Sequence, residues 1–237
     1  MSELLVAREG AVVTLTLNRP DKANALSAAL VEELHQALDG LDEGARLLVL
    51  RGAGKNFCAG FDFGGFEEAG IGELSWRFVR IEQLLQRLYH APCATLALAQ
   101  GGCFGAGADL LAVCGERICA PETRLRMPGW KFGLALGTRR LAARIGAEPA
   151  RRVLGAAQVV DAASALQLGL VHQVADAAAW PDCVTRAATA AVSLSPMAQA
   201  QLHGLTLADT RAADMAALVE SLTGSDLKAR IRAFRAQ

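Results

Sequence analysis

The stretch CATLALAQGGCFGAGADLLAV, residues 93–113, contains an apolar run, a glycine-rich turn and a second apolar segment in succession. It begins with Cys93–Ala99, an apolar run of the length of a buried strand. The small-residue run Gly101–Gly107 follows and leads into the apolar segment Ala108–Val113, which we expect to be helical. Glycine lets a backbone approach a ligand closely, and the helix that follows points its free N–H groups outward. We therefore expect a ligand-binding or catalytic site at this strand-to-helix turn.

The same order of elements occurs earlier in the chain. Residues 4–7 and 12–17 alternate in polarity and predict a hairpin. Ser27 is placed to cap a helix whose apolar positions recur with the helical period. Arg46–Leu50 predicts a short buried strand that ends at the glycine-rich segment Gly52–Gly65. Strands therefore alternate with helices through the first half of the chain.

A second amphipathic helix has its apolar positions at Phe78, Ile81, Leu85 and Leu88. It should end before Pro92, because a residue that precedes proline disfavours the helical conformation. From Gly137 onward the pattern is almost wholly helical, apart from residues 170–174. Strands that alternate with helices predict an α/β fold. We expect a core at residues 1–192 and a helical C-terminal region at residues 193–237.

The composition excludes several classes of protein. Acidic and basic residues number 24 each, which argues against a nucleic-acid-binding protein. The six cysteines contain no CxxC pair and the four histidines have no metal-ligand spacing, so we expect no metal and a reducing, cytoplasmic compartment. The first residues predict no signal peptide, and no run approaches the roughly 18 apolar residues of a membrane span. We therefore expect a soluble protein with no nucleic-acid or membrane partner.

Two glycine-rich segments are candidates for a ligand site: NFCAGFDF at residues 56–63 and GGCFGAGAD at residues 101–109. Neither has the GxGxxG pattern, and Gly52–Lys55 lacks the spacing and the Ser/Thr of a phosphate-binding loop. The segments are therefore either tight turns of an α/β core or a pair of backbone hydrogen-bond donors. Two such segments, each between a buried strand and a helix, favour the paired donors.

Four ordered segments resemble the crotonase superfamily, which contains the enoyl-CoA hydratases and isomerases. They are NRPDKANAL at residues 18–26, LVLRGAGKNFCAGFDF at 48–63, GGCFGAGADLLAVC at 101–114 and DAASALQLGLV at 161–171. The similarity extends from the first hairpin to about Val174. It implies a crotonase-like (ClpP/crotonase) spiral of β-β-α units with a helical C-terminal trimerisation region, here shortened.

The resemblance also implies an enzyme that acts on an acyl-CoA thioester in fatty acid metabolism. Its oxyanion hole would consist of the backbone N–H groups of Phe61 and Ala106, and the helix that starts at Ala106 would add its positive dipole end. Asp109 would be the single retained acid or base. Coenzyme A is part of the substrate, so no separate cofactor is expected. The implied assembly is a homotrimer or a dimer of trimers.

The family's substrate path carries over to ten residues of this chain. They are Lys22, Ala23, Leu26, Ala59, Gly60, Asp62, Phe63, Gly105, Gly129 and Trp130. Lys22 could meet a phosphate of coenzyme A or be a solvated surface lysine. Trp130 and Phe132 are expected to form the pocket wall rather than to act chemically.

The chain departs from the family's hydratases at the second catalytic carboxylate. Addition of water to an enoyl thioester needs one group to activate water and one to deliver a proton. Asp109 stands at the first of these positions, but Gly129 stands at the second. Glu67, Glu68 or Glu73 could supply the missing acid from a loop. Otherwise the chain either performs a different family reaction (isomerisation, decarboxylation or dehydration, on acyl-CoA or acyl carrier protein) or is a catalytically degenerate protein that binds acyl-CoA.

Asp109 and a run of arginines each have a structural as well as a functional interpretation. Asp109 could interact with a helix N-terminus or satisfy a buried polar network, but its position three residues after Ala106 favours catalysis. Burial in an apolar pocket would raise its pKa. A basic run predicts a helix face that is solvated or interfacial. Its members are Arg139, Arg140, Arg144, Arg151 and Arg152.

Overall fold

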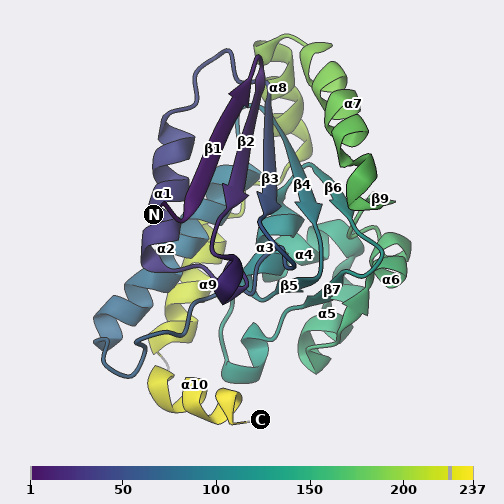
Figure 1. Cartoon of the computed structure of the whole chain (residues 1–237). Coiled ribbons are helices and arrows are strands. Elements are labelled where there is room, and N and C mark those ends of the chain that lie inside the picture. The colour runs from purple at the N-terminus through teal and green to yellow at the C-terminus, as the bar shows by residue number, and fades with distance from the viewer. Residues whose placement is uncertain (1, 224–225, 237) are drawn as a thin grey trace.

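The computed structural model describes residues 2–223 and 226–236. Its main sheet has six strands in the order β1-β2-β3-β4-β6-β9 (Figure 1). They are β1 Leu4–Glu9, β2 Val12–Leu17, β3 Leu47–Gly52, β4 Ala94–Ala99, β6 Glu116–Cys119 and β9 Gln173–Val174. Only the β1–β2 pair is antiparallel among these described strands. A smaller sheet joins β5 Gly102–Phe104, β7 Arg124–Arg126 and β8 Val160–Asp161.

Helices connect the strands and cover the sheet (Figure 1). They are α1 Ala28–Asp39, α2 Ile71–Tyr89, α3 Ala106–Val113, α4 Thr138–Ile145, α5 Ala147–Ala156, α6 Ala162–Gln167, α7 Trp180–Val192, α8 Pro196–Thr206, α9 Arg211–Thr223 and α10 Leu227–Arg235. Short 3-10 turns lie at Pro20–Lys22, Gly129–Phe132 and Ala177–Ala179. The predicted α/β class is confirmed. No helix in the described part of the chain is long and apolar enough to cross a membrane.

Side chains of β3 are buried on both faces of the main sheet. Leu48 and Leu50 belong to the large core that includes residues of α1, α2 and α3. Leu47 and Val49 belong to a second core, which Trp180 of α7 completes. Because both faces are covered, this strand is a continuous apolar run instead of an alternating one.

The C-terminal helices pack onto the large core. Leu218 and Leu222 of α9, with Leu227 and Ile231 of α10, are buried in the same cluster as the apolar face of α2. In Figure 1, α10 lies at the end of the molecule opposite the β1–β2 turn. These contacts bring the last helix next to the segments that follow the glycine-rich turns.

Some boundaries differ from those that the sequence predicted. Helix α2 begins at Ile71, so Glu73 lies in its first turn and not in a loop. Residues 170–174 contain only the two-residue strand β9. Strands β7 and β8 were not predicted, because runs of two or three residues are too short to show a period.

The prediction of a solvated or interfacial arginine face is wrong for Arg140, whose side chain is only 3% exposed. It forms ion pairs with Glu82 and Asp214 inside the protein. Arg144, on the same helix, donates from Nε to the backbone oxygen of Ala112 at 2.9 Å. The positive charges of these two residues therefore serve internal contacts.

Asn24 joins the segment after β2 to the first glycine-rich turn. It is fully buried, and its backbone adopts a left-handed conformation with φ 55°, which asparagine tolerates better than most residues. Its Nδ2 donates to the backbone oxygens of Ala53 at 2.9 Å and Asn56 at 2.8 Å, and its Oδ1 accepts from the N–H of Arg19 at 2.8 Å.

Asn24→Ala should lower the free energy of unfolding by about 3 kcal/mol, because it leaves buried backbone groups without partners and strains the left-handed conformation. Urea unfolding followed by circular dichroism measures this loss. The matched control is Asn18→Ala, which removes one exposed hydrogen bond to Ser2 and should change stability by less than about 0.5 kcal/mol. Equal losses in the two variants would contradict this role of Asn24.

Candidate active site

The two glycine-rich turns lie side by side and pair like short parallel strands. The N–H of Phe57 donates to the oxygens of Gln100 at 2.8 Å and Gly102 at 3.1 Å, and the N–H of Phe104 donates to the oxygen of Cys58 at 2.9 Å. Asn56 Oδ1 accepts from the N–H of Gly102 at 2.8 Å. Segments that are more than forty residues apart in the chain are thereby held in one register.

Glycine is required where these turns touch. A Cβ atom on Gly107 would lie 2.3 Å from the backbone oxygen of Cys58. Gly60 has φ +85°, and a Cβ there would lie 2.5 Å from the oxygen of Phe104 and 3.1 Å from the nitrogen of Ala106. Larger residues at these positions would separate the turns. The close approach therefore brings the backbone of residues 60–61 next to the start of α3.

The backbone N–H groups of Phe61 and Ala106 are both free in the part of the chain that the structure describes. Leu26 bonds to the residues on either side of Phe61, donating to Gly60 at 2.7 Å and accepting from Asp62 at 3.2 Å. Ala106 is the first residue of α3, where an N–H has no partner within the helix. Both residues line the same cavity. The geometry thus offers two backbone donors to a ligand.

The ring of Phe61 fixes the position of its backbone. It stacks on the ring of Phe78 of α2 with 4.1 Å between centroids, and the guanidinium carbon of Arg77 lies 4.5 Å from the centroid of Phe61. Such contacts lock a side-chain rotamer and, through it, the main chain to which it is attached.

The cavity has a volume of about 530 Å³, within the range of small-molecule sites. Trp130 and Phe132 belong to its wall, as expected for pocket residues. Further wall residues come from segments that the sequence did not single out, among them Arg124, Leu134, Leu154, Val159 and Phe234. No local signal could have found these residues, because they lie on different elements and share only an apolar or basic side chain.

Asp109 is the only residue with a carboxyl group among the described residues that line the cavity. Its side chain lies on α3 and is 4% exposed. Burial raises its pKa to about 7, while the charge of Arg140 lowers the pKa and that of Glu82 raises it. The direction agrees with the expectation from sequence. A carboxyl group with a pKa near neutrality can both give and take a proton.

Asp109 Oδ1 takes no part in a hydrogen-bond network of the described residues. This oxygen is buried and has no hydrogen-bond partner among them. The atom lies against Gly137, where a Cβ would be only 1.5 Å away. Gly137 has φ +65° and precedes α4 directly. A buried polar atom without a partner costs free energy and is typical of functional sites.

The structure brings the three expected catalytic residues and half of the expected substrate path to one cavity. The catalytic residues are Phe61, Ala106 and Asp109, and the residues of the path that line the cavity are Ala59, Phe63, Gly105, Gly129 and Trp130. Lys22, Ala23, Leu26, Gly60 and Asp62 do not line it. Asp62 forms an ion pair with Arg19 at 2.8 Å, and Lys22 is exposed. The roles of these residues in binding coenzyme A stay predictions.

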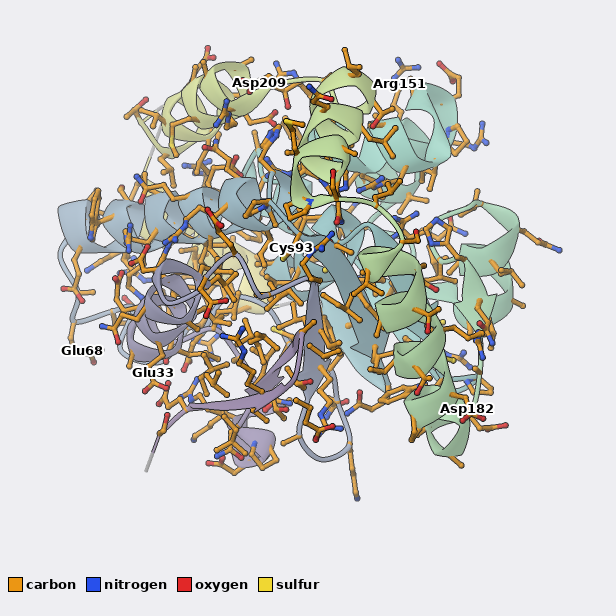
Figure 2. The ribbon with its side chains drawn as sticks, turned by 90° about the horizontal axis from the view of Figure 1, so that it is seen from above. Glu33, Glu68, Cys93, Arg151, Asp182 and Asp209 are labelled. Carbon is orange, nitrogen blue, oxygen red and sulfur yellow. The ribbon has the colours of Figure 1, made fainter. Side chains whose placement is uncertain are left out.

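None of the three glutamates considered as a second acid lines the cavity. Glu67 forms a two-pronged ion pair with Arg232 of α10, with oxygens 2.7 and 2.8 Å from the guanidinium. Glu68 lies at the outer edge of the molecule in Figure 2. Glu73 is exposed in the first turn of α2. Among the described residues the cavity therefore has one carboxyl group, and Gly129 contributes only backbone to its wall.

Glu82 was missed, although the sequence contained a signal for it. It lies on α2 one turn after Phe78, on the face that is otherwise apolar, and is fully buried. An acid within an apolar helix face needs a buried partner. Here the partner is Arg140.

The chain is similar to the same group of known proteins in its family model, in its sequence and in its structure. The family model "Enoyl-CoA hydratase/isomerase" matches residues 7–224. "Probable enoyl-CoA hydratase echA6" of Mycobacterium tuberculosis is 34% identical over 194 residues, covering 79% of this chain and 78% of that protein. "Ethylmalonyl-CoA decarboxylase" of Homo sapiens is 32% identical over 177 residues, covering 72% of this chain and 57% of that protein.

A solved structure from Bordetella parapertussis, "putative enoyl-CoA hydratase/isomerase", is 48% identical with a TM-score of 0.98, and each chain is covered completely. The crotonase-like fold that the sequence resemblance implied is therefore confirmed. The expected enzyme class, an enoyl-CoA hydratase/isomerase-like lyase or isomerase, is confirmed as well.

The raised pKa of Asp109 predicts a pH-dependent stability. The unfolded chain releases this proton near the ordinary value of 3.8 and the folded protein near 7, so folding favours the protonated form. Stability from this group is present at low pH and is lost as the pH rises towards 7. The loss should be at most about 4 kcal/mol, since one pKa unit corresponds to about 1.4 kcal/mol.

Urea unfolding of the wild type and Asp109→Asn between pH 4.5 and 8 isolates this contribution. The wild type should lose stability relative to the variant as the pH rises to 7, because asparagine has no proton to release. A difference between the two proteins that is constant with pH would contradict the raised pKa.

Proposed function

Because the chain belongs to the enoyl-CoA hydratase/isomerase family, we propose that it binds an acyl-CoA thioester and holds its carbonyl oxygen with the N–H groups of Phe61 and Ala106. The observation that carries this proposal is the pair of free backbone donors at one apolar cavity. Removal of a proton or of a carboxylate next to a thioester places negative charge on the carbonyl oxygen. Donors that are already in position stabilise that charge without reorganising.

Asp109 is the group that moves a proton. It lies on α3 three residues after Ala106, and its pKa of about 7 suits transfer in either direction at neutral pH. Coenzyme A enters as part of the substrate, with Lys22, Ala23, Leu26 and Asp62 along its path as the family resemblance implies. The proposal also includes a cytoplasmic location and an assembly that is a homotrimer or a dimer of trimers.

The cavity favours an apolar acyl group. Its wall contains Phe63, Phe78, Phe132, Leu134 and Leu136, and burying an apolar group against such residues is favourable by about 25 cal/mol per Å². Charged side chains at the wall are limited, among the described residues, to Asp109, Arg124 and Arg126.

The single carboxyl group favours a second candidate reaction, decarboxylation. Hydration needs two groups for acid and base work, whereas loss of carbon dioxide from a carboxylated acyl-CoA needs only one proton donor. The carbon–carbon bond breaks, its electron pair forms the thioester enolate, and the proton of Asp109 then forms the new carbon–hydrogen bond. A relative that is 32% identical is named ethylmalonyl-CoA decarboxylase, which supports this candidate.

Incubation with crotonyl-CoA and with carboxylated acyl-CoA thioesters, followed by mass spectrometry, tests these reactions. A gain of water identifies a hydratase, and a loss of carbon dioxide identifies a decarboxylase. In either reaction Asp109→Asn should reduce turnover about 100-fold or more and leave acyl-CoA affinity nearly unchanged. Binding without any product would indicate an acyl-CoA-binding protein without activity, and no binding would contradict the proposal.

Ala106→Pro tests the oxyanion hole, because proline fits the first position of a helix but has no N–H group. We expect kcat/KM on the reactive acyl-CoA to fall about 10²–10³-fold, as for loss of one oxyanion donor. Ala106→Gly keeps the N–H group and is the matched control, with an expected loss of less than about tenfold. A proline variant as active as the glycine variant would show that this N–H group is not a donor.

A further inference from the structure

We propose that Glu82, Arg140 and Asp214 form a buried charged unit that holds Arg140 near Asp109 and stabilises the carboxylate left after Asp109 donates its proton. The three residues do not line the substrate cavity, so they are positioning residues that act through Asp109. The part of this inference that concerns the fate of the proton rests on the proposed function.

The unit is fixed by strong contacts between three helices. Arg140 of α4 donates to both oxygens of Glu82 of α2, at 2.8 and 2.5 Å, and to Asp214 of α9 at 3.2 Å. Arg139 donates to the second oxygen of Asp214 at 2.9 Å. Glu82 is fully buried, and Arg140 and Asp214 are 3% and 8% exposed. Buried charges are costly when unpaired, so this arrangement resists rearrangement.

Gly137 lets this unit reach Asp109. It lies three residues before Arg140, and Asp109 Oδ1 sits where its side chain would begin. The carboxyl group of Asp109 therefore lies directly against the first turn of the helix that carries Arg140. The positive charge of Arg140 lowers the pKa of Asp109, and the negative charge of Glu82 raises it.

Burial, and not the cluster, favours the protonated form of Asp109 at rest. Burial is the largest effect on this carboxyl group and raises its pKa to about 7, whereas Arg140 lowers the pKa by more than Glu82 raises it. Arg139 and Arg140 offset Glu82 and Asp214, so the cluster itself is neutral. The thiol of Cys103 on β5 lies near Asp109, and burial keeps it neutral by raising its pKa well above the ordinary value. The net effect of the cluster is therefore to favour the carboxylate of Asp109.

Two buried atoms show how the unit responds when the proton leaves. Asp109 Oδ1 and Arg140 Nε both have no hydrogen-bond partner among the described residues. The first atom is an acceptor and the second a donor. When the O–H bond of Asp109 breaks and its proton forms a carbon–hydrogen bond with the substrate enolate, the positive charge of Arg140 stabilises the carboxylate that remains.

A separate small cavity of about 210 Å³ lies beside the charged unit. Glu82, Gly137 and Asp214 line it, and Trp130 lies in its wall and in that of the substrate cavity. Trp130 Nε1 donates to Thr138 at 3.0 Å. A cavity of this size with charged side chains in its wall has room for several water molecules. Water there can contact Glu82 and Asp214 without entering the substrate cavity.

The test is the titration of Asp109 in the protein without substrate. The carbonyl band of its protonated carboxyl group is measured by infrared difference against Asp109→Asn at pH 4 to 10. Glu82→Gln removes a negative charge and should move the midpoint to lower pH, whereas Arg140→Gln removes a positive charge and should move it to higher pH. We expect shifts of about one pH unit in each direction.

Two further variants keep the test decisive if Arg140→Gln does not fold. Asp214→Asn should shift the midpoint in the same direction as Glu82→Gln, and Arg140→Lys, which keeps the cation, should restore a midpoint near that of the wild type. The control is Arg151→Gln, an exposed arginine at the outer edge of the molecule in Figure 2, which should leave the midpoint unchanged.

Opposite shifts support the charged unit, whatever reaction the protein performs. Shifts in the same direction, or none, overturn it even if Asp109→Asn abolishes turnover. If the shifts occur as expected but Asp109→Asn does not change turnover, the unit stands and the catalytic role proposed for Asp109 fails.

Discussion

The main chains of the two glycine-rich turns touch, and the geometry of the active site follows from this contact. The backbone of residues 101–107 lies so close to that of residues 55–60 that side chains at Gly60, Gly101 and Gly107 would collide with main-chain atoms. Hydrogen bonds of Asn24 and Asn56 hold the turns in this position. The contact brings two free N–H groups to one cavity, that of Phe61 beside the bridge to Leu26 and that of Ala106 at the start of α3.

Burial of charge is the second physical feature of the site. The interior next to Asp109 contains two further acids and a buried arginine, which would be costly without their mutual contacts. Apolar residues of equal volume could fill the same space, and in other proteins such replacements are often neutral or stabilising. The cluster is therefore better explained by its effect on Asp109 than by a contribution to stability.

Much of the fold was predictable from the sequence, because its central strands are apolar runs and its turns are marked by glycine. Cys93–Ala99 and Arg46–Leu50 coincide within a residue or two with β4 and β3. The short strands β7 and β8 were not predictable, since pairing between distant segments creates them. The pocket residues Val159 and Phe234 were not predicted either, because folding brings them to the cavity from distant parts of the chain. Asp109 and the two donors were found through motif resemblance, whereas Arg140 was misjudged because its partners lie 58 and 74 residues away.

In the proposed function, two backbone N–H groups bind the thioester oxygen. The infrared spectrum of a bound acyl-CoA that carries carbon-13 at the thioester carbonyl reports on these two hydrogen bonds. Two donors withdraw electron density from the carbonyl, so its stretching frequency should fall clearly below that of the free thioester in water. A bound frequency equal to or above the free value would show that the N–H groups of Phe61 and Ala106 do not hold this oxygen.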